Sequence, residues 1–199
     1  MVIYEMKYPN GKKFIPQTIP TMISTTQRGM NLEKELNDSN TYYKEINRAL
    51  IYKKPTPVQI VRVDYPSRNK ARIVEAYYTT PSTTDYNGIY RGRAIDFEAK
   101  ETQSKTSFPF KSIHPHQINH LKAVLQHGGI GFVIIRFCAY DETYLIDAQY
   151  FITKYEDTKR RSLPYSDIQK NGHLITQAYL PRLNYLNIVD QLYFEEETV

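Results

Sequence analysis

The chain has 199 residues, of which 41% are hydrophobic and 24% charged, with 26 Lys and Arg against 21 Asp and Glu and a net charge of +5. This composition excludes a disordered chain, and the longest apolar run, Gly129 to Ile135, is far shorter than the about 20 residues of a transmembrane helix. The single cysteine excludes an internal disulfide and the first residues show no signal-peptide pattern, so we expect a cytoplasmic protein rather than a secreted or membrane one.

The N-terminal half of the chain predicts an arm, a helix and a hairpin. Residues 1–27 contain three prolines and no hydrophobic period, which predicts a flexible basic arm. From about Arg28 to Leu50 apolar residues recur at helical spacing, with Ser39 as the one weak step, and this predicts a helix. Residues 58–80 alternate β-branched and polar residues around a basic turn. They predict a protruding β-hairpin, which we call the stalk, or else an ordinary edge hairpin kept soluble by its charge.

The rest of the chain predicts strands that alternate with helices. Strands are expected at 83–89 and 94–100 as a hairpin, at 131–140 and at 144–146; helices are expected at 115–127, 148–155 and 181–194, and a loop at 107–113. There is no repeat and no linker long enough to split the chain. The order predicts an α/β fold in which helices flank one mixed central β-sheet, as a single domain over residues 28–199 with the stalk inserted.

The stretch from residue 82 to 101 carries the most chemical information. Successive strand side chains alternate between faces, so Asp96, Glu98 and Lys100 share one face, which is not expected in a core. Asp85 comes level with Glu98 if the two strands pair as a hairpin. Two carboxylates beside a lysine offer oxygen ligands to Mg²⁺ and a cation for phosphodiester hydrolysis. Taken alone, the pattern is equally typical of a solvated strand face with a Glu/Lys pair.

Longer runs in the same region are more specific, and with them the chain resembles the RecU family of Holliday junction resolvases. The matching runs are RGM at 28–30, KKPTPVQIV at 53–61, TTDYNGIY at 83–90, IDFEAKET at 95–102 and KTSFP at 105–109, with YPNG at 8–11. The resemblance covers essentially the whole chain from residue 8, and the similarity is weaker beyond residue 109.

The resemblance implies a homodimeric endonuclease with a restriction-endonuclease-like core of the PD-(D/E)xK type. Such an enzyme uses Mg²⁺, for which Mn²⁺ can substitute, and resolves four-way (Holliday) DNA junctions by paired symmetric nicks during homologous recombination and DNA repair. The resemblance assigns catalysis to Asp85, Glu98 and Lys100, and the metal site to Thr83, Asp85, Glu98 and Gln117. It also implies that the stalk inserts at the junction centre and that a recombinase is a partner.

Basic residues supply the expected DNA contacts. Six basic residues and one acidic residue lie between Lys53 and Arg72. The chain also has 18 tyrosines, which either stack on bases or fill a half-buried β-rich surface. Guanidinium groups suit phosphate recognition. The residues that we predict to contact DNA are Arg28, Lys53, Lys54, Arg68, Lys70, Arg72, Arg91 and Arg93.

Some residues, and the function itself, keep a second interpretation. Glu33 on the first helix either reaches the metal or is solvated, and Gln117 taken alone is typical of an exposed polar residue. His114, His116 and His120 lack the further ligands that a zinc site needs. The alternative functions are a non-cleaving, structure-specific DNA-binding protein that modulates a recombinase, and a restriction endonuclease that cuts duplex DNA.

A homodimer is expected from the symmetry of the substrate. Resolution needs two nicks on opposed strands of a two-fold symmetric junction, and two active sites on a two-fold axis fit that need. The sequence leaves the contact open between the apolar strand around Phe132–Phe137 and the base of the stalk.

Overall fold

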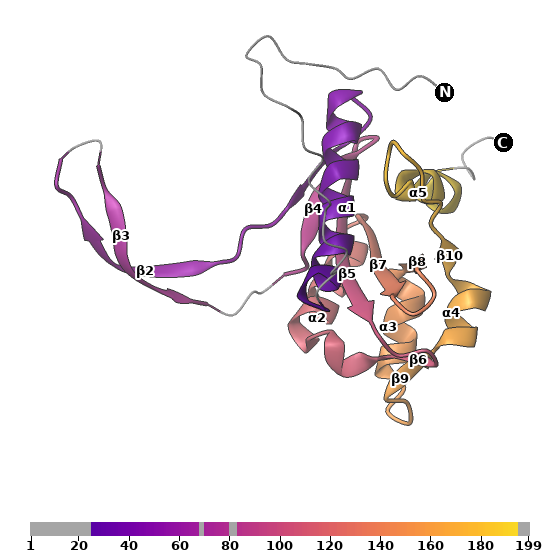
Figure 1. Cartoon of the computed structure of the whole chain (residues 1–199). Coiled ribbons are helices and arrows are strands. Elements are labelled where there is room, and N and C mark those ends of the chain that lie inside the picture. Colours follow the sequence, from indigo (N-terminus) through magenta and orange to yellow (C-terminus); the bar gives the residue numbers. More distant parts are fainter. Residues whose placement is uncertain (1–24, 68–69, 80–82, 195–199) are drawn as a thin grey trace, which may run out of the picture.

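The computed structural model describes residues 25–67, 70–79 and 83–194, with side chains from Leu32 onward. Residues 1–24, most of the predicted arm, lie outside this range. Figure 1 shows a body of helices around a central sheet, from which the stalk projects. The elements are α1 (Thr25–Glu45), β1 (Leu50–Lys53), β2 (Val58–Asp64), β3 (Arg72–Tyr78), β4 (Tyr86–Tyr90), β5 (Arg93–Thr102), β6 (Ser107–Pro109), the 3-10 helix η1 (Phe110–Ser112), α2 (Pro115–Gln126), β7 (Ile130–Phe137), β8 (Glu142–Asp147), α3 (Ala148–Glu156), β9 (Ser162–Pro164), α4 (Tyr165–Asn171), β10 (His173–Leu174) and α5 (Tyr185–Tyr193).

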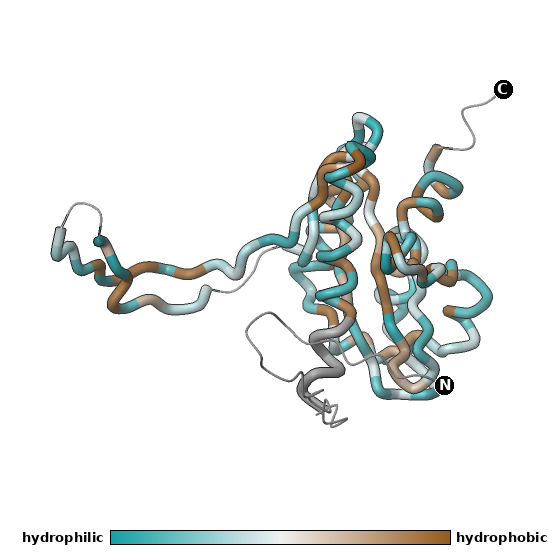
Figure 2. The backbone as a smooth tube through the Cα atoms, turned by 45° about the horizontal axis from the view of Figure 1, so that its top comes forward, coloured by the Kyte–Doolittle hydropathy of each residue, from teal (hydrophilic) through white to brown (hydrophobic). Residues whose placement is uncertain are grey.

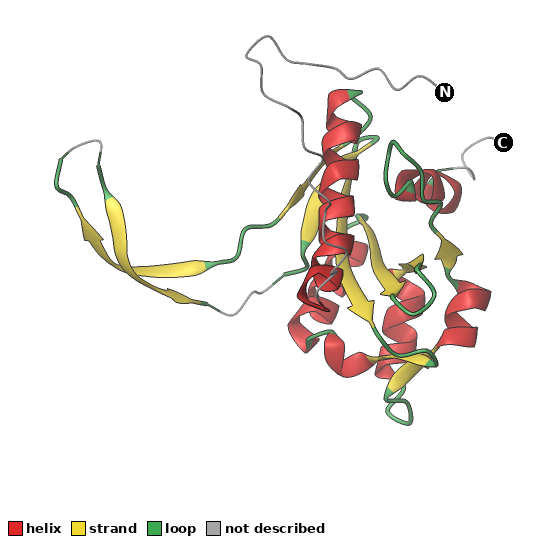
Figure 3. Cartoon of the chain, in the orientation of Figure 1, coloured by secondary structure: helices red, strands yellow, loops and turns green. Residues whose placement is uncertain are grey.

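The central sheet has six strands in the order β1-β4-β5-β7-β8-β10. β5 and β7 pair in parallel through the crossover helix α2, and every other neighbouring pair in this sheet is antiparallel. Helices lie on both sides of the strands (Figure 3). The predicted α/β class, with a mixed central sheet flanked by helices, is therefore confirmed.

Two hydrophobic cores lie on the two faces of the sheet. β7 is buried along its whole length, and its side chains enter the two cores alternately. Phe132 belongs to the core beneath α1 and α5, and Val133 belongs to the core beneath α2 and α3. The rings of Tyr86, Phe97 and Phe132 stack in succession across three strands, with centroid distances of 4.8 and 4.6 Å. Because this chain itself covers β7 completely, the prediction of a dimer contact around Phe132–Phe137 is wrong.

A tight turn sets the register of the β4–β5 hairpin. Arg91 and Gly92 form the turn with φ angles of +48° and +79°, and two consecutive positive φ angles are the signature of a type I′ turn. Glycine adopts such an angle without a steric penalty. The resulting register places Tyr86 opposite Phe97, so Asp85 comes level with the residue that follows Phe97.

The structure differs from the sequence prediction at the end of the first helix. α1 ends at Glu45, and Leu50 starts the edge strand β1 instead of ending the helix. Asn47, with a φ of +56°, breaks the helix between them. Ser39, the polar residue that interrupts the apolar pattern of this helix, is buried. Its hydroxyl donates to the Glu35 carbonyl and accepts from the backbone N–H of Leu183. Among the helices of the described residues, α1 included, none is long and apolar enough to cross a membrane.

Three further differences lie in the second half of the chain. The predicted loop over 107–113 contains β6 and η1, because β6 pairs with β9 from a distant part of the sequence. β9, α4 and β10 were not predicted, and the last helix begins at Tyr185 rather than at residue 181. α2 agrees with the prediction to within one residue.

The predicted stalk is confirmed as a projecting two-stranded hairpin of β2 and β3. Figure 2 shows apolar stretches along both of its strands. Tyr77 and Tyr78 are neighbours in the regular part of β3 and so point to opposite faces, and their exposed fractions are 60% and 84%. Ile73 and Val74 lie at a β-bulge and are 55% and 46% exposed. The stalk thus presents large aromatic and aliphatic side chains to solvent, the aromatic ones on both faces. Residues 68–69 and 80–82 lie outside the described residues.

Candidate active site

The β4–β5 hairpin brings Asp85, Glu98 and Lys100 together. The backbone N–H of Asp85 donates to Oε2 of Glu98 at 3.2 Å. Nζ of Lys100 forms an ion pair with Oε1 of Glu98 and lies 3.6 Å from Oδ2 of Asp85. One cationic and two anionic side chains therefore meet at a single point of the sheet, as the hairpin register predicted.

The strand face that carries these groups is buried, contrary to the sequence expectation. The side chain of Glu98 is completely buried, whereas those of Lys100 and Asp85 are 27% and 36% exposed. α2 packs over this face of β5 as part of the crossover to β7. Side-chain alternation along one strand does not reveal that cover, because both faces of β5 lie beneath helices.

Burial changes the ionisation of this group. Burial raises the pKa of Glu98 to about 8; the hydrogen bond and charge of Asp85 add to this effect, and Lys100 opposes it. The pKa of Lys100 is raised as well, because its attraction to Glu98 and Asp85 outweighs the opposing effect of burial. At neutral pH these groups therefore favour a protonated Glu98, because Lys100 offsets only in part the cost of a second buried negative charge beside Asp85.

The carboxylate pair fits a hard divalent cation. Oε1 of the buried Glu98 carboxylate forms an ion pair with Lys100, and Oε2 accepts from the backbone N–H of Asp85. The carboxylate of Asp85 also lies beside Lys100, so two carboxylates share one ammonium group and a further cation between them would be favourable. Two carboxylates with neutral oxygens nearby are a typical ligand set for Mg²⁺.

Thr83 lies on the same segment as Asp85, and Gln117 lies on α2, which packs against β5. Thr83 lies two residues before Asp85, and its hydroxyl contacts the carbonyl of Thr84 at 3.4 Å. Gln117 lies in the first turn of α2 and is only 4% exposed, so the interpretation of an exposed polar residue is wrong. Its Oε1 accepts from the backbone N–H of His114 at 2.9 Å and completes a capping box.

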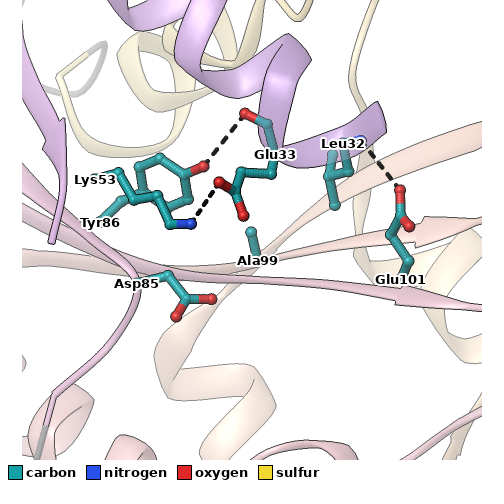
Figure 4. A pocket seen from close by; sticks show the side chains of 7 residues that line it. All are labelled: Leu32, Glu33, Lys53, Asp85, Tyr86, Ala99 and Glu101. Atoms are coloured by element: carbon teal, nitrogen blue, oxygen red, sulfur yellow. Dashed lines mark hydrogen bonds and ion pairs between the residues drawn. The ribbon is translucent and has the colours of Figure 1, made fainter. Parts of the chain in front are cut away.

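Glu33 and Lys53 line a cavity between α1 and the sheet (Figure 4). Oε1 of Glu33 lies 2.5 Å from Nζ of Lys53, so each side chain already has a charged partner. In Figure 4 the carboxylate of Asp85 points away from that of Glu33. The residues that line the cavity are Leu32, Glu33, Lys53, Asp85, Tyr86, Ala99 and Glu101.

Lys54, which sequence reasoning grouped with the DNA contacts, instead joins a polar cluster beside the carboxylate pair. Its Nζ lies 2.9 Å from Oδ2 of Asp96 and 3.1 Å from the hydroxyl of Thr84. His120 on α2 completes this group, which we call the Lys54 cluster. Sequence reasoning did not connect these four residues, and the only local signal was the position of Asp96 on the same strand face as Glu98.

The remaining predicted DNA contacts are spread over the molecule. Lys70 is exposed next to the stalk tip, and Arg72 pairs with Asp64 on the stalk at 2.8 Å. Arg68 and the side chain of Arg28 lie outside the described residues. The stalk therefore carries two of the predicted contacts on exposed surface.

Arg91 lies in the turn that closes the β4–β5 hairpin, and Arg93 is the first residue of β5. Arg91 pairs with Asp190 at 3.1 Å, and its guanidinium carbon lies 4.3 Å from the ring centroid of Phe194. Nε and Nη2 of Arg93 donate to the carbonyl of Gly128 at 3.2 and 3.0 Å. Both arginines thus contact the C-terminal helix region or the loop after α2.

The three histidines of the α2 region do not converge on a metal site. The rings of His114 and His116 stack at a centroid distance of 5.3 Å, whereas His120 contacts Asp96. The part of the chain that the structure describes contains no group of three or more His, Cys, Asp and Glu residues able to hold a metal ion. A candidate cation site therefore has to combine Asp85 and Glu98 with neutral oxygens.

Comparison with known proteins agrees with this geometry. Residues 27–191 match the model of the family described as RecU, recombination protein U. Proteins named "Holliday junction resolvase RecU" are 52% identical in Geobacillus sp. (strain WCH70) and 49% identical in Geobacillus thermodenitrificans and in Bacillus cereus (strain B4264). These alignments cover 94–95% of this chain and 98% of each relative.

Among solved structures, Archaeoglobus fulgidus Hjc, "a Holliday junction resolvase from an archaeal hyperthermophile", aligns with a TM-score of 0.45 and 10% identity, over 73% of this chain and 95% of that one. That likeness is too weak to carry information about function. The family match and the sequence identities over nearly the full length are decisive, and the chain belongs to the RecU family.

Proposed function

We propose that the protein is a Holliday junction resolvase, a Mg²⁺-dependent endonuclease that cuts four-way DNA junctions by paired symmetric nicks during homologous recombination and DNA repair. The observation that carries the proposal is the meeting of Asp85, Glu98 and Lys100 on one hairpin, in a chain whose relatives are named Holliday junction resolvases. A protein that only binds DNA has no need to bury a carboxylate between a second carboxylate and a lysine.

The residues divide the chemistry between them. Asp85 and Glu98 would hold Mg²⁺, with Thr83 and Gln117 completing the site. Mg²⁺, when bound, neutralises charge that develops on the phosphate and lowers the pKa of a coordinated water. Lys100 lies beside both carboxylates, where its ammonium group either orients the attacking water or donates to a phosphoryl oxygen. Mn²⁺ is expected to substitute because it favours the same oxygen ligands.

A homodimer supplies the second nick. An isolated two-stranded hairpin is marginally stable in water, yet the stalk exposes large apolar side chains, among them Ile73 and Val74. The stalk of a second copy can cover these side chains. Such an arrangement would place two stalks at the junction centre and two carboxylate pairs on either side of it. A recombinase remains the expected protein partner.

Cleavage assays on matched substrates test the proposal. A labelled four-way junction and a linear duplex of the same sequence are incubated with the protein in Mg²⁺ and in EDTA, alongside Glu98→Gln. We expect symmetric paired nicks on the junction alone, lost in EDTA and in the variant, while junction binding in EDTA persists. Tight junction binding with no cleavage by the wild type in Mg²⁺ or Mn²⁺ would instead establish a structure-specific binding protein. Equal cutting of the duplex would establish a restriction-type enzyme.

A further inference from the structure

The Lys54 cluster is a connected polar network that the proposed reaction does not use. Nζ of Lys54 donates to Oδ2 of Asp96 at 2.9 Å and to the hydroxyl of Thr84 at 3.1 Å. The Thr84 hydroxyl itself donates to the other oxygen of Asp96. Nε2 of His120 lies 3.2 Å from Asp96 and 3.4 Å from Lys54, so it donates to the carboxylate or accepts from the ammonium according to its tautomer.

The cluster is withdrawn from solvent. Thr84 and Asp96 are 2% and 7% exposed, and 19% of the Lys54 side chain is exposed. An ammonium group has three N–H donors. Asp96 and Thr84 accept two of them, and His120 accepts the third in the tautomer that leaves its Nε2 unprotonated. The loss of either charged partner would leave an unpaired buried charge, which is strongly unfavourable.

Each segment that carries a candidate metal ligand also contributes one member of the cluster. Thr84 lies between Thr83 and Asp85. Asp96 lies two residues before Glu98 on β5 and therefore on the same strand face.

The third segment is α2, where His120 lies three residues, about one helical turn, after Gln117. Lys54 contacts all three segments, and its backbone N–H also donates to the carbonyl of Asp85 at 2.8 Å.

We infer that the Lys54 cluster is a positioning device for the metal site. Lys54 and Asp96 fix the segment before β4, the strand β5 and the start of α2 relative to one another, so that the ligands on these three segments are held at the spacing that one cation needs. Lys54 and Asp96 are thus positioning residues, and neither touches the reacting atoms. The inference rests on the proposed function, because it assigns the cluster to the same metal site.

A direct metal-binding measurement tests the inference without relying on cleavage. Mn²⁺ binding to the full-length protein without DNA is followed by electron paramagnetic resonance for the wild type, Asp96→Asn, Lys54→Met and the double variant. Substitution of residues that orient metal ligands without coordinating the metal typically lowers metal affinity or activity 10–100-fold. We expect each single variant to weaken Mn²⁺ binding at least about tenfold. Because the two residues belong to one network, the factor by which the double variant weakens binding should be much smaller than the product of the two single-variant factors. Junction binding in EDTA should change less than twofold.

Lys122→Met is the matched control, because Lys122 on α2 also forms an ion pair, with Glu156, but lies outside the cluster. It should bind Mn²⁺ as the wild type does. Melting temperatures identify any variant that is simply unfolded, and Lys54→Arg, which keeps the charge, should recover part of the affinity. Unchanged Mn²⁺ affinity in folded Asp96→Asn and Lys54→Met would overturn the inference. A loss of junction binding in EDTA by Lys54→Met would overturn it in favour of a direct DNA contact. A wild type that binds no Mn²⁺ would instead refute the proposed metal site itself.

Discussion

The backbone N–H of Asp85 donates to the Glu98 carboxylate at 3.2 Å, although 13 positions separate the two residues. The contact follows from the register of the β4–β5 hairpin, and the two-residue turn of Arg91 and Gly92 fixes that register. A slip of one residue would turn Glu98 to the opposite face of the sheet. The local turn chemistry of this chain therefore determines whether the side chain of Glu98 can lie beside Asp85.

Replacement of Lys100 should separate catalysis from binding. Lys100→Met keeps the aliphatic stem and removes the ammonium group beside Asp85 and Glu98. Loss of one preorganised electrostatic group typically lowers a rate by about 10²–10³-fold, and we expect that decrease in the single-turnover cleavage rate of a four-way junction in Mg²⁺. Junction affinity in EDTA should stay within about threefold of the wild type, since one phosphate contact at most is lost. A rate within a few-fold of the wild type would contradict the assigned role.

The stability of the metal-free protein should fall as the pH rises. Burial raises the pKa of Glu98 to about 8 in the folded protein, whereas the pKa of a glutamate in an unfolded chain is about 4.3. Between these values the folded state binds more protons than the unfolded state, so the free energy of unfolding decreases with pH and levels off above about pH 8. The slope for one group is at most about 1.4 kcal/mol per pH unit.

Urea unfolding in EDTA at several pH values between 5 and 8.5 measures this effect. Glu98→Gln has no proton to lose at this position, so the difference in unfolding free energy between the variant and the wild type should widen in the variant's favour as the pH rises. Titrating groups that do not interact with Glu98 cancel in that difference. Parallel profiles for the two proteins would show that Glu98 ionises normally.

Local sequence signals were sufficient where the structure depends on neighbouring residues. α2 was predicted to within one residue because Pro115 fits its first turn and Gly128, with a φ of +77°, follows its end. The approach of Asp85 to Glu98 was predictable because strand alternation and a short hairpin determine it.

Features that depend on distant contacts could not be predicted from the sequence. β6 and β9 have three residues each and exist because they pair with one another. The complete burial of Glu98 results from the cover of α2, and Lys54 reaches Asp96 across 42 positions. Leu50, the first residue of β1, was predicted to end the helix because it continues the helical spacing of the apolar residues for one more turn.

Arg93 should contribute to stability rather than to DNA binding. Two of its guanidinium nitrogens donate to the carbonyl of Gly128, and its guanidinium carbon lies 5.7 Å from the ring centroid of Phe194. Arg93→Ala should therefore lower the free energy of unfolding by about 1–2 kcal/mol, measured by urea unfolding, and leave junction affinity in EDTA unchanged. Lys70→Ala at the exposed stalk tip is the converse control, with unchanged stability and weaker binding. If Arg93 contacts a phosphate, Arg93→Ala will bind the junction less tightly. The slope of the logarithm of the binding constant against the logarithm of the salt concentration will then fall in magnitude by about one.

Self-association should depend on the apolar faces of the stalk. Ile73 and Val74 lie side by side at a β-bulge of β3 and are both about half exposed, so a second copy that packs on the stalk can bury them. Two lysines at these positions would make that burial unfavourable. We expect the double variant Ile73→Lys, Val74→Lys to shift the protein from dimer to monomer in sedimentation velocity, and to lose paired nicking together with the dimer.

Leu174→Lys provides the matched control for this shift. Leu174 is 56% exposed on β10, the strand at the far edge of the central sheet from β1, so a lysine there adds charge without touching the stalk. This variant should sediment as the wild type does, and far-ultraviolet circular dichroism should show that both variants stay folded. A double stalk variant that remains dimeric would place the dimer contact on the body, where the exposed apolar side chains of Leu50, Tyr52 and Ile89 on the paired strands β1 and β4 offer the next surface. A dimer built through the stalk and one built through the body predict different distances between the two active sites, and the spacing of the two nicks on the junction would then distinguish them.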